Sequence, residues 1–90
     1  MRLDAFLANS GRLARRTVAK RACDEGLVEL DGKPAKAATA VSVGQQVTLR
    51  TGLAVRTYRI LALPERPVPR DRRDDYSELV SSQAVMPDSN

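Results

Sequence analysis

The apolar side chains of this chain change their spacing at Gly26, and this change constrains the fold more than any other feature. Before Gly26, Leu3, Phe6 and Leu7 recur at i, i+3 and i+4, which places them on one face of a helix. After Gly26, Val47-Thr48-Leu49 alternates apolar and polar residues, as a half-buried strand does. The order of the two patterns predicts an α+β domain, with two N-terminal helices packed on a small antiparallel sheet.

Two helices are predicted before Gly26. The first ends at Asn9-Ser10-Gly11, and the second runs from about Leu13 to Glu25. Gly26 then stands where a residue in the left-handed conformation commonly ends a helix. Small apolar residues of the second helix are expected to face the core: Val18, Ala19, Ala22 and Cys23.

Turn signals divide residues 27–63 into strands. Asp31-Gly32 is a strong hairpin signal, and Thr51-Gly52 turns the chain again. Pro34 cannot donate to a ladder, so Lys33–Lys36 is expected to be an edge strand or a loop. The strands expected around these turns cover residues 27–30, 47–49 and 55–63.

The folded domain is predicted to span residues 1–63, and residues 64–90 to form a Pro- and charge-rich tail that is partly disordered. Spaced prolines and a run of mixed charge interrupt regular structure between Pro64 and Asp75, and residues 81–90 are predicted to be disordered. Truncation after Leu63 is therefore expected to change the melting temperature little. One exception stays open, a short docked turn formed by Tyr76, Leu79 and Val80.

Charge is divided along the same boundary. Residues 1–63 hold 11 Lys and Arg against 5 Asp and Glu, a net charge of +6, whereas residues 64–90 hold 4 against 6. Arginine outnumbers lysine 12 to 3, and a guanidinium group makes paired hydrogen bonds to phosphate oxygens. With Phe6, Tyr58 and Tyr76 as the only aromatic residues, the chain has no platform for stacking bases. The composition favours folded RNA, recognised by shape and charge.

The cations between Gly11 and Lys20 follow the spacing of one helix face. Arg12, Arg16 and Lys20 stand at i, i+4 and i+8, and Arg15 widens the row. Cations early in a helix oppose its dipole, so helix stability alone does not explain this order. Two interpretations remain open, a solvated charged face and a surface that binds anions.

No catalytic or metal-binding constellation is predicted. The chain has no histidine, and Cys23 is its only cysteine, so it offers neither a Cys-His or Ser-His pair nor a zinc site. Asp4, in the first turn beside Arg2, is expected to favour the helix dipole and to orient the guanidinium. We expect no enzyme activity, no cofactor and no metal. An apolar run of signal-peptide or membrane-span length is absent from the sequence, which predicts a cytoplasmic location.

Four motifs follow one another along residues 1–63. They are Met-Arg-Leu-Asp-x-Phe-Leu, Arg-Arg-Thr-x-Ala-Lys, Gly-Leu-Val-Glu-Leu-Asp-Gly-Lys with Lys36 following, and Val-x-Val-Gly. Their order resembles the RNA-binding domain named after small-subunit ribosomal protein S-four. Within that family, short members that act in bacterial ribosome quality control are the most similar.

The resemblance implies a cytoplasmic, non-catalytic protein that is monomeric off the ribosome. Such a protein binds large-subunit rRNA and peptidyl-tRNA on stalled large ribosomal subunits. It assists a partner that adds C-terminal alanine tails to the stalled chain. The RNA-binding residues that this resemblance and the cation spacing predict are Arg2, Arg12, Arg15, Arg16, Lys20 and Lys36.

Other roles remain open. Within the family, a heat-shock member that recycles ribosomes recognises a similar subunit, but its long basic C-terminal extension has no counterpart here. Outside it stand an accessory domain detached from an RNA-modifying enzyme and a protein-interaction adaptor with a basic face. An adaptor is expected to present aromatic anchors, in which this chain is poor. Arg50 and Arg56, beside the Thr51-Gly52 turn, are either solvated edge charges or peripheral phosphate contacts.

Overall fold

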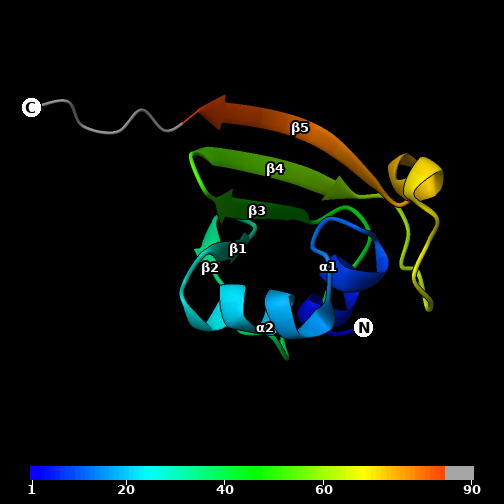
Figure 1. Ribbon diagram of the computed structural model, residues 1–90, viewed down its shortest axis with the longest axis horizontal. Helices are drawn as coiled ribbons and strands as arrows, with labels where there is room; N and C mark the ends of the chain where they lie inside the picture. Colours follow the sequence, from blue (N-terminus) through cyan, green and yellow to red (C-terminus); the bar gives the residue numbers. More distant parts are fainter. Residues whose placement is uncertain (85–90) are drawn as a thin grey trace, which may run out of the picture.

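The computed structural model describes residues 1–84 and has two layers, helices below and a sheet above (Figure 1). The elements in chain order are α1 (Leu3–Asn9), α2 (Arg16–Asp24), β1 (Val28–Leu30), β2 (Lys33–Pro34), β3 (Gln46–Thr51), β4 (Ala54–Ile60), the 3-10 helix η1 (Arg70–Asp75) and β5 (Ser77–Ala84). The strands form one antiparallel sheet in the order β2-β1-β3-β4-β5. The predicted α+β class is confirmed.

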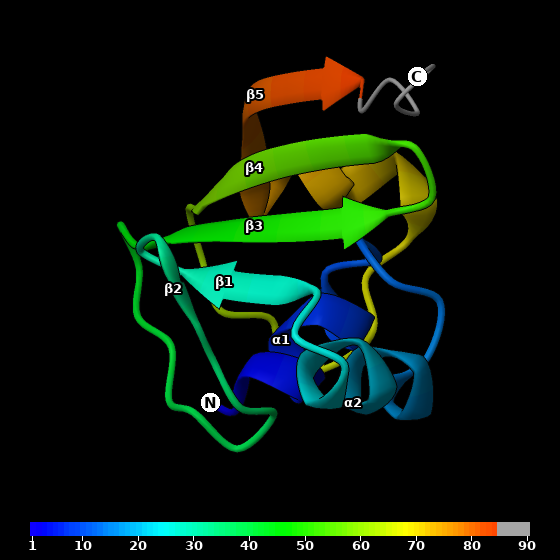
Figure 2. The same ribbon diagram turned by 90° about the vertical axis from the view of Figure 1, so that its left-hand side faces the viewer.

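Both helices cover the same face of the sheet, and the core lies between the two layers (Figure 2). Leu3, Phe6 and Leu7 of α1 are fully buried, as their spacing predicts. The sheet contributes its alternating inward residues, which are Val28, Val47, Leu49, Tyr58 and Ile60. Full burial of an apolar side chain of this size stabilises the fold by about 1.5–3 kcal/mol. Helices and sheet therefore depend on each other for stability.

Helix α2 begins three residues later than predicted. The N–H of Leu13 donates to the carbonyl of Leu7 at 3.0 Å, and Gly11 has a φ of +78°, so the chain folds back on α1 before α2 begins. Arg15 is the N-terminal capping residue, with extended backbone angles. Of the residues expected to face the core, Ala19, Ala22 and Cys23 are buried, whereas Val18 is 45% exposed. The expectation for Val18 is wrong because the buried face of α2 is centred on Ala19, Ala22 and Cys23, and Val18 lies at its edge.

The predicted turns are confirmed. Gly26 has a φ of +75° directly after the C-terminal cap of α2, and Asp31 and Gly32 have φ angles of +50° and +84° in the β1–β2 turn. Positive φ at both central residues is the geometry of the favoured hairpin turn, whose twist matches that of the strands. β2 is a short edge strand containing Pro34, as expected.

The prediction that the folded part ends at Leu63 is wrong. β5 pairs with β4 along its length, from Ser77 opposite Ile60 to Ala84 opposite Ala54. The sheet thus extends through Ala84, and residues 81–84 are ordered, while residues 85–90 lie outside the described residues. The docked turn left open for Tyr76, Leu79 and Val80 is also wrong, because Leu79 and Val80 lie in β5 with 51% and 44% of their surface exposed.

Candidate nucleic-acid interface

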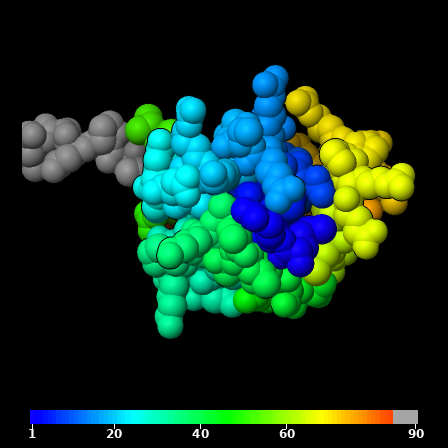
Figure 3. All heavy atoms as spheres, turned by 90° about the horizontal axis from the view of Figure 1, so that it is seen from below, coloured from blue at the N-terminus to red at the C-terminus, as the bar shows by residue number. Residues whose placement is uncertain are grey.

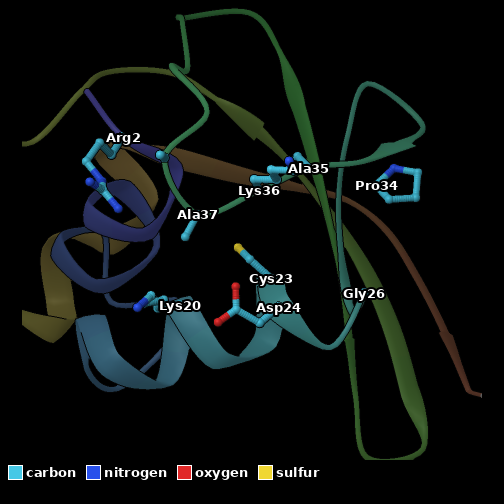
Figure 4. Close-up of a pocket in the computed structure, with 10 residues that line it drawn as sticks. Arg2, Lys20, Cys23, Asp24, Gly26, Pro34, Ala35, Lys36 and Ala37 are labelled. Atoms are coloured by element: carbon cyan, nitrogen blue, oxygen red, sulfur yellow. The ribbon is translucent and has the colours of Figure 1, made fainter.

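Arg2, Lys20 and Lys36 lie around one hollow of about 550 Å³ (Figure 4). Lys20 comes from α2, Lys36 from the loop after β2, and Arg2 precedes α1. The floor of the hollow includes the buried Cys23. Burial and the nearby carboxylates of Asp4 and Asp24 raise the pKa of the Cys23 thiol, which favours a packing role over a reactive one. The hollow therefore presents three cations together with the Asp24 carboxylate, and its thiol is not activated.

Backbone hydrogen bonds hold the segment after β2 against the N-terminus. The N–H of Leu3 donates to the carbonyl of Thr39 at 2.8 Å, and the N–H of Val41 donates to the carbonyl of Met1 at 2.9 Å. Seen as atoms, the dark blue N-terminal residues lie between the lighter blue α2 and the green segment after β2 (Figure 3). These bonds fix Arg2 and Lys36 on the same face although 34 positions separate them in the sequence.

Arg2 and Arg16 share the buried carboxylate of Asp4. The distances are 3.1 Å from Arg2 Nε to Asp4 Oδ1 and 3.5 Å from Arg16 Nε to Asp4 Oδ2. The Asp4 side chain is only 3% exposed, whereas those of Arg2 and Arg16 are 47% and 57% exposed. Each guanidinium is thus anchored on one side and open to solvent on the other. The expected orienting role of Asp4 toward Arg2 is confirmed, and the same carboxylate also holds Arg16.

Opposing effects set the pKa of Asp4. Burial disfavours the ionised form, but hydrogen bonds from Arg2 and from the Ala5 N–H, together with the charge of Arg16, lower the pKa below its ordinary value. The ionised carboxylate is therefore the stable form at neutral pH. Its contribution to folding is complete above the unfolded-state pKa, roughly 3.9, and is lost as the pH falls through the folded-state pKa.

We expect Asp4→Asn to lower the free energy of unfolding by about 1–2 kcal/mol at pH 7, because both guanidinium groups lose their charged acceptor. The difference from the wild type should shrink as the pH falls below about 3.9, because Asp4 then protonates first in the unfolded chain and, at lower pH, in the folded protein. Urea melts at pH 7 and near pH 3 measure both effects. Asp24→Asn is the matched control, since Asp24 is exposed, and it should stay within about 0.5 kcal/mol. A pH-independent loss at Asp4 would contradict this role.

The predicted stripe of Arg12, Arg16 and Lys20 is wrong for Arg12. This residue precedes α2, and its side chain, which is 11% exposed, contacts β4, η1 and β5. Arg12 Nε donates to Ser77 Oγ at 2.6 Å, and the guanidinium carbon lies 4.4 Å from the centre of the Tyr58 ring. Its contacts are those of a packing residue.

The other cations named from the sequence differ in whether they line a hollow. Arg15 is exposed at the start of α2, and Arg16 and Lys20 line a second hollow of about 310 Å³ together with Arg2. Thr17, which sequence analysis missed, lines that hollow too. The only feature of the sequence that could have indicated Thr17 is its position directly after Arg16, in the first turn of α2. Arg50 is paired with Glu29 at 2.9 Å, and neither Arg50 nor Arg56 lines either hollow.

Comparison with known proteins identifies the family. The S4 domain family matches residues 1–47. The RQC P-site tRNA stabilizing factor of Halalkalibacterium halodurans is 40% identical over 65 residues, which are 72% of this chain and 74% of that protein. The chain belongs to the S4 domain family. The protein of the same name from Bacillus subtilis is 34% identical over 79 residues, which are 88% of this chain and 92% of that protein.

A solved structure extends the similarity beyond the matched S4 residues. Vibrio cholerae Heat Shock Protein 15 superposes with a TM-score of 0.84 at 25% identity, over 90% of this chain and 82% of that chain. All the predicted RNA-binding residues lie within the S4 match, whereas η1 and β5 lie after it. No helix within residues 1–84 is long and apolar enough to cross a membrane.

Proposed function

We propose that this S4 domain protein binds P-site tRNA and large-subunit rRNA on stalled large ribosomal subunits. In this role it is a non-catalytic, cytoplasmic factor of ribosome quality control that assists a partner adding C-terminal alanine tails. The observation that carries the proposal is the convergence of Arg2, Arg16, Lys20 and Lys36 around two adjoining hollows on one face. The names of the relatives support the tRNA and quality-control parts of the proposal.

The chemistry of this face suits an RNA backbone. Within residues 1–84, Lys20 and Lys36 make no ion pair, and Arg2 and Arg16 use only part of their donor capacity on Asp4. Guanidinium and ammonium groups presented on a rigid surface bind phosphate oxygens without reading base identity. The Asp4 anchor reduces the side-chain entropy that Arg2 and Arg16 lose when they bind.

Sedimentation tests the proposal as a whole. Tagged protein from a lysate, separated on a sucrose gradient and cross-linked to RNA, should co-sediment with large subunits and cross-link to both tRNA and large-subunit rRNA. Cross-links to small-subunit or non-ribosomal RNA alone would contradict it. Loss of alanine tails from stalled chains in a deletion strain tests the quality-control step separately.

A second candidate is a heat-shock role in ribosome recycling, favoured by the TM-score of 0.84 to Vibrio cholerae Heat Shock Protein 15. The two roles differ in when the protein is needed. A recycling role predicts that its amount on large subunits rises after heat shock. A quality-control role predicts that its amount rises when translation is stalled at constant temperature.

We expect Arg16→Ala to weaken tRNA binding by about tenfold or more, because a charge-assisted contact contributes about 1.5–3 kcal/mol. Arg56→Ala is the matched control, since Arg56 is exposed on the sheet and lines neither hollow, and it should change the dissociation constant less than twofold. Fluorescence anisotropy with labelled tRNA at several salt concentrations measures both variants. Arg16→Ala should also reduce the slope of log K against log salt by about one unit if Arg16 holds one phosphate.

Equal losses at Arg16 and Arg56 would contradict a focused interface, and a flat salt dependence of the wild type would favour an apolar protein interface instead. Arg16 also contacts Asp4, so its removal affects the fold as well as the surface. Thermal melts therefore have to show that both variants are folded at the temperature of the binding assay. The comparison holds where both variants are folded.

A further inference from the structure

A third hollow, of about 250 Å³, lies between the α1–α2 loop and the segment that follows β4. Gly11 and Ala14 line it from the loop, and Val68 lines it from the other side. Two arginines of η1, Arg70 and Arg73, complete its wall. The hollow therefore combines an apolar lining with two guanidinium groups, and these two arginines lie outside residues 1–47, which the S4 family matches.

Arg73 is fixed in this wall by its contacts. Its Nε donates to the carbonyl of Arg70 at 3.3 Å, and one terminal nitrogen donates to the carbonyl of Gly11 at 3.4 Å. The aliphatic part of Arg73 packs on Gly11 so closely that a Cβ at residue 11 would lie 2.6 Å from Arg73 Cδ. Glycine at this position thus permits the close approach that seats Arg73.

The guanidinium of Arg70 differs from that of its neighbour Arg72. Arg72 Nε donates to Asp75 Oδ2 at 2.8 Å, so its charge is paired within η1. Arg70 is exposed and makes no ion pair with any carboxylate of residues 1–84. An unpaired guanidinium at the wall of a hollow is a ready donor to an incoming anion.

The hollow lies close in the chain to the surface formed by Arg2, Arg16, Lys20 and Lys36. Ala14 in its wall directly precedes Arg15 and Arg16. In the space-filling view, the yellow segment after β4 lies beside the blue N-terminal residues on the same face (Figure 3). Arg70 thus lies on the same side of the molecule as Arg16 and Lys20.

We propose that this hollow binds a further backbone phosphate of the RNA held by the S4 surface, with Arg70 as the direct contact. Arg73 keeps the wall in place and adds positive charge. The proposal rests on the proposed RNA-binding function and extends its footprint to η1. The segment after residue 63 then has a binding role in addition to its place in the sheet.

Arg70→Ala and Arg72→Ala form a matched pair for the test, because both remove an exposed arginine from the same 3-10 helix. With labelled tRNA, Arg70→Ala should raise the dissociation constant about five- to tenfold and reduce the salt slope by about 0.7–0.9. Arg72→Ala should change the dissociation constant less than twofold. Arg70→Lys should keep the salt slope, because the lysine retains one point charge.

Arg16→Ala, measured in parallel, separates this proposal from the proposed function. If Arg16→Ala weakens binding and Arg70→Ala does not, the hollow binds no phosphate while the RNA-binding function stands. If neither variant weakens binding, both proposals fail. Equal weakening by Arg70→Ala and Arg72→Ala would also overturn the site, because the loss would then follow net charge.

Discussion

Truncation after Leu63 is expected to lower the free energy of unfolding by about 3–5 kcal/mol and the melting temperature by more than about 12 °C. The reason is that β5 supplies the whole outer ladder of β4, and Ser77, opposite Ile60, is fully buried. Circular dichroism melts of chains ending at Leu63 and at Ala84 measure the difference. This result is the opposite of what the composition of residues 64–90 suggests.

Two features make the loss large. The hydrogen bonds of the β4–β5 ladder disappear together, and the hydrogen bond from the Asn9 side chain to the Pro64 carbonyl, 3.0 Å, is removed with them. Tyr58 also loses its strand partner, Leu79 of β5. A truncated chain that melts within about 2 °C of the longer one would show that β5 adds little, and the domain boundary would return to Leu63.

Arg12→Ala is expected to destabilise the fold by about 2–4 kcal/mol, because its guanidinium joins the α1–α2 loop to β4 and β5. It donates to Ser77 Oγ at 2.6 Å, to the Ser77 carbonyl at 3.0 Å and to Asp74 at 3.0 Å, and it stacks on Tyr58. Most of this effect comes from the contacts with Ser77 and Tyr58, since the Asp74 side chain is 93% exposed and its ion pair is screened by water.

Arg15→Ala is the matched control for Arg12. Arg15 is exposed three positions later in the chain, so its removal should change stability by less than about 0.5 kcal/mol. Thermal melts of both variants decide between the two interpretations of the early cations. If Arg12→Ala and Arg15→Ala have the same melting temperature, Arg12 is a solvated or RNA-facing residue and the packing role is wrong.

Local patterns were sufficient for the elements that local chemistry controls. The i, i+3, i+4 spacing of Leu3, Phe6 and Leu7 predicted α1, because a helix with one apolar face is specified by its own residues. Asp31-Gly32 predicted the β1–β2 turn, because few residues other than glycine, asparagine and aspartate accept positive φ. The Asp4 carboxylate was correctly placed beside Arg2, a neighbour two positions away.

β5 could not be predicted in this way. Of Ser77–Ala84 only Ser77 is buried, so the strand has no apolar alternation, and its pairing with β4 is made by backbone groups that every sequence possesses. The later start of α2 has a similar cause. The spacing of Arg12, Arg16 and Lys20 fits a helix, but the hydrogen bond from Leu13 to Leu7 holds the loop against α1 instead.

The sequence by itself determined the α+β class, the buried face of α1, the turns, and a cationic composition suited to phosphate, because each depends on residue type and near neighbours. Only the tertiary structure decided which cations share a surface. It joins Lys36 to Arg2 through the backbone bonds of residues 39–41, seats Arg16 on Asp4, and draws Arg12 away to Ser77. These contacts link positions far apart in the chain, and helical or strand periodicity carries no information about such pairs.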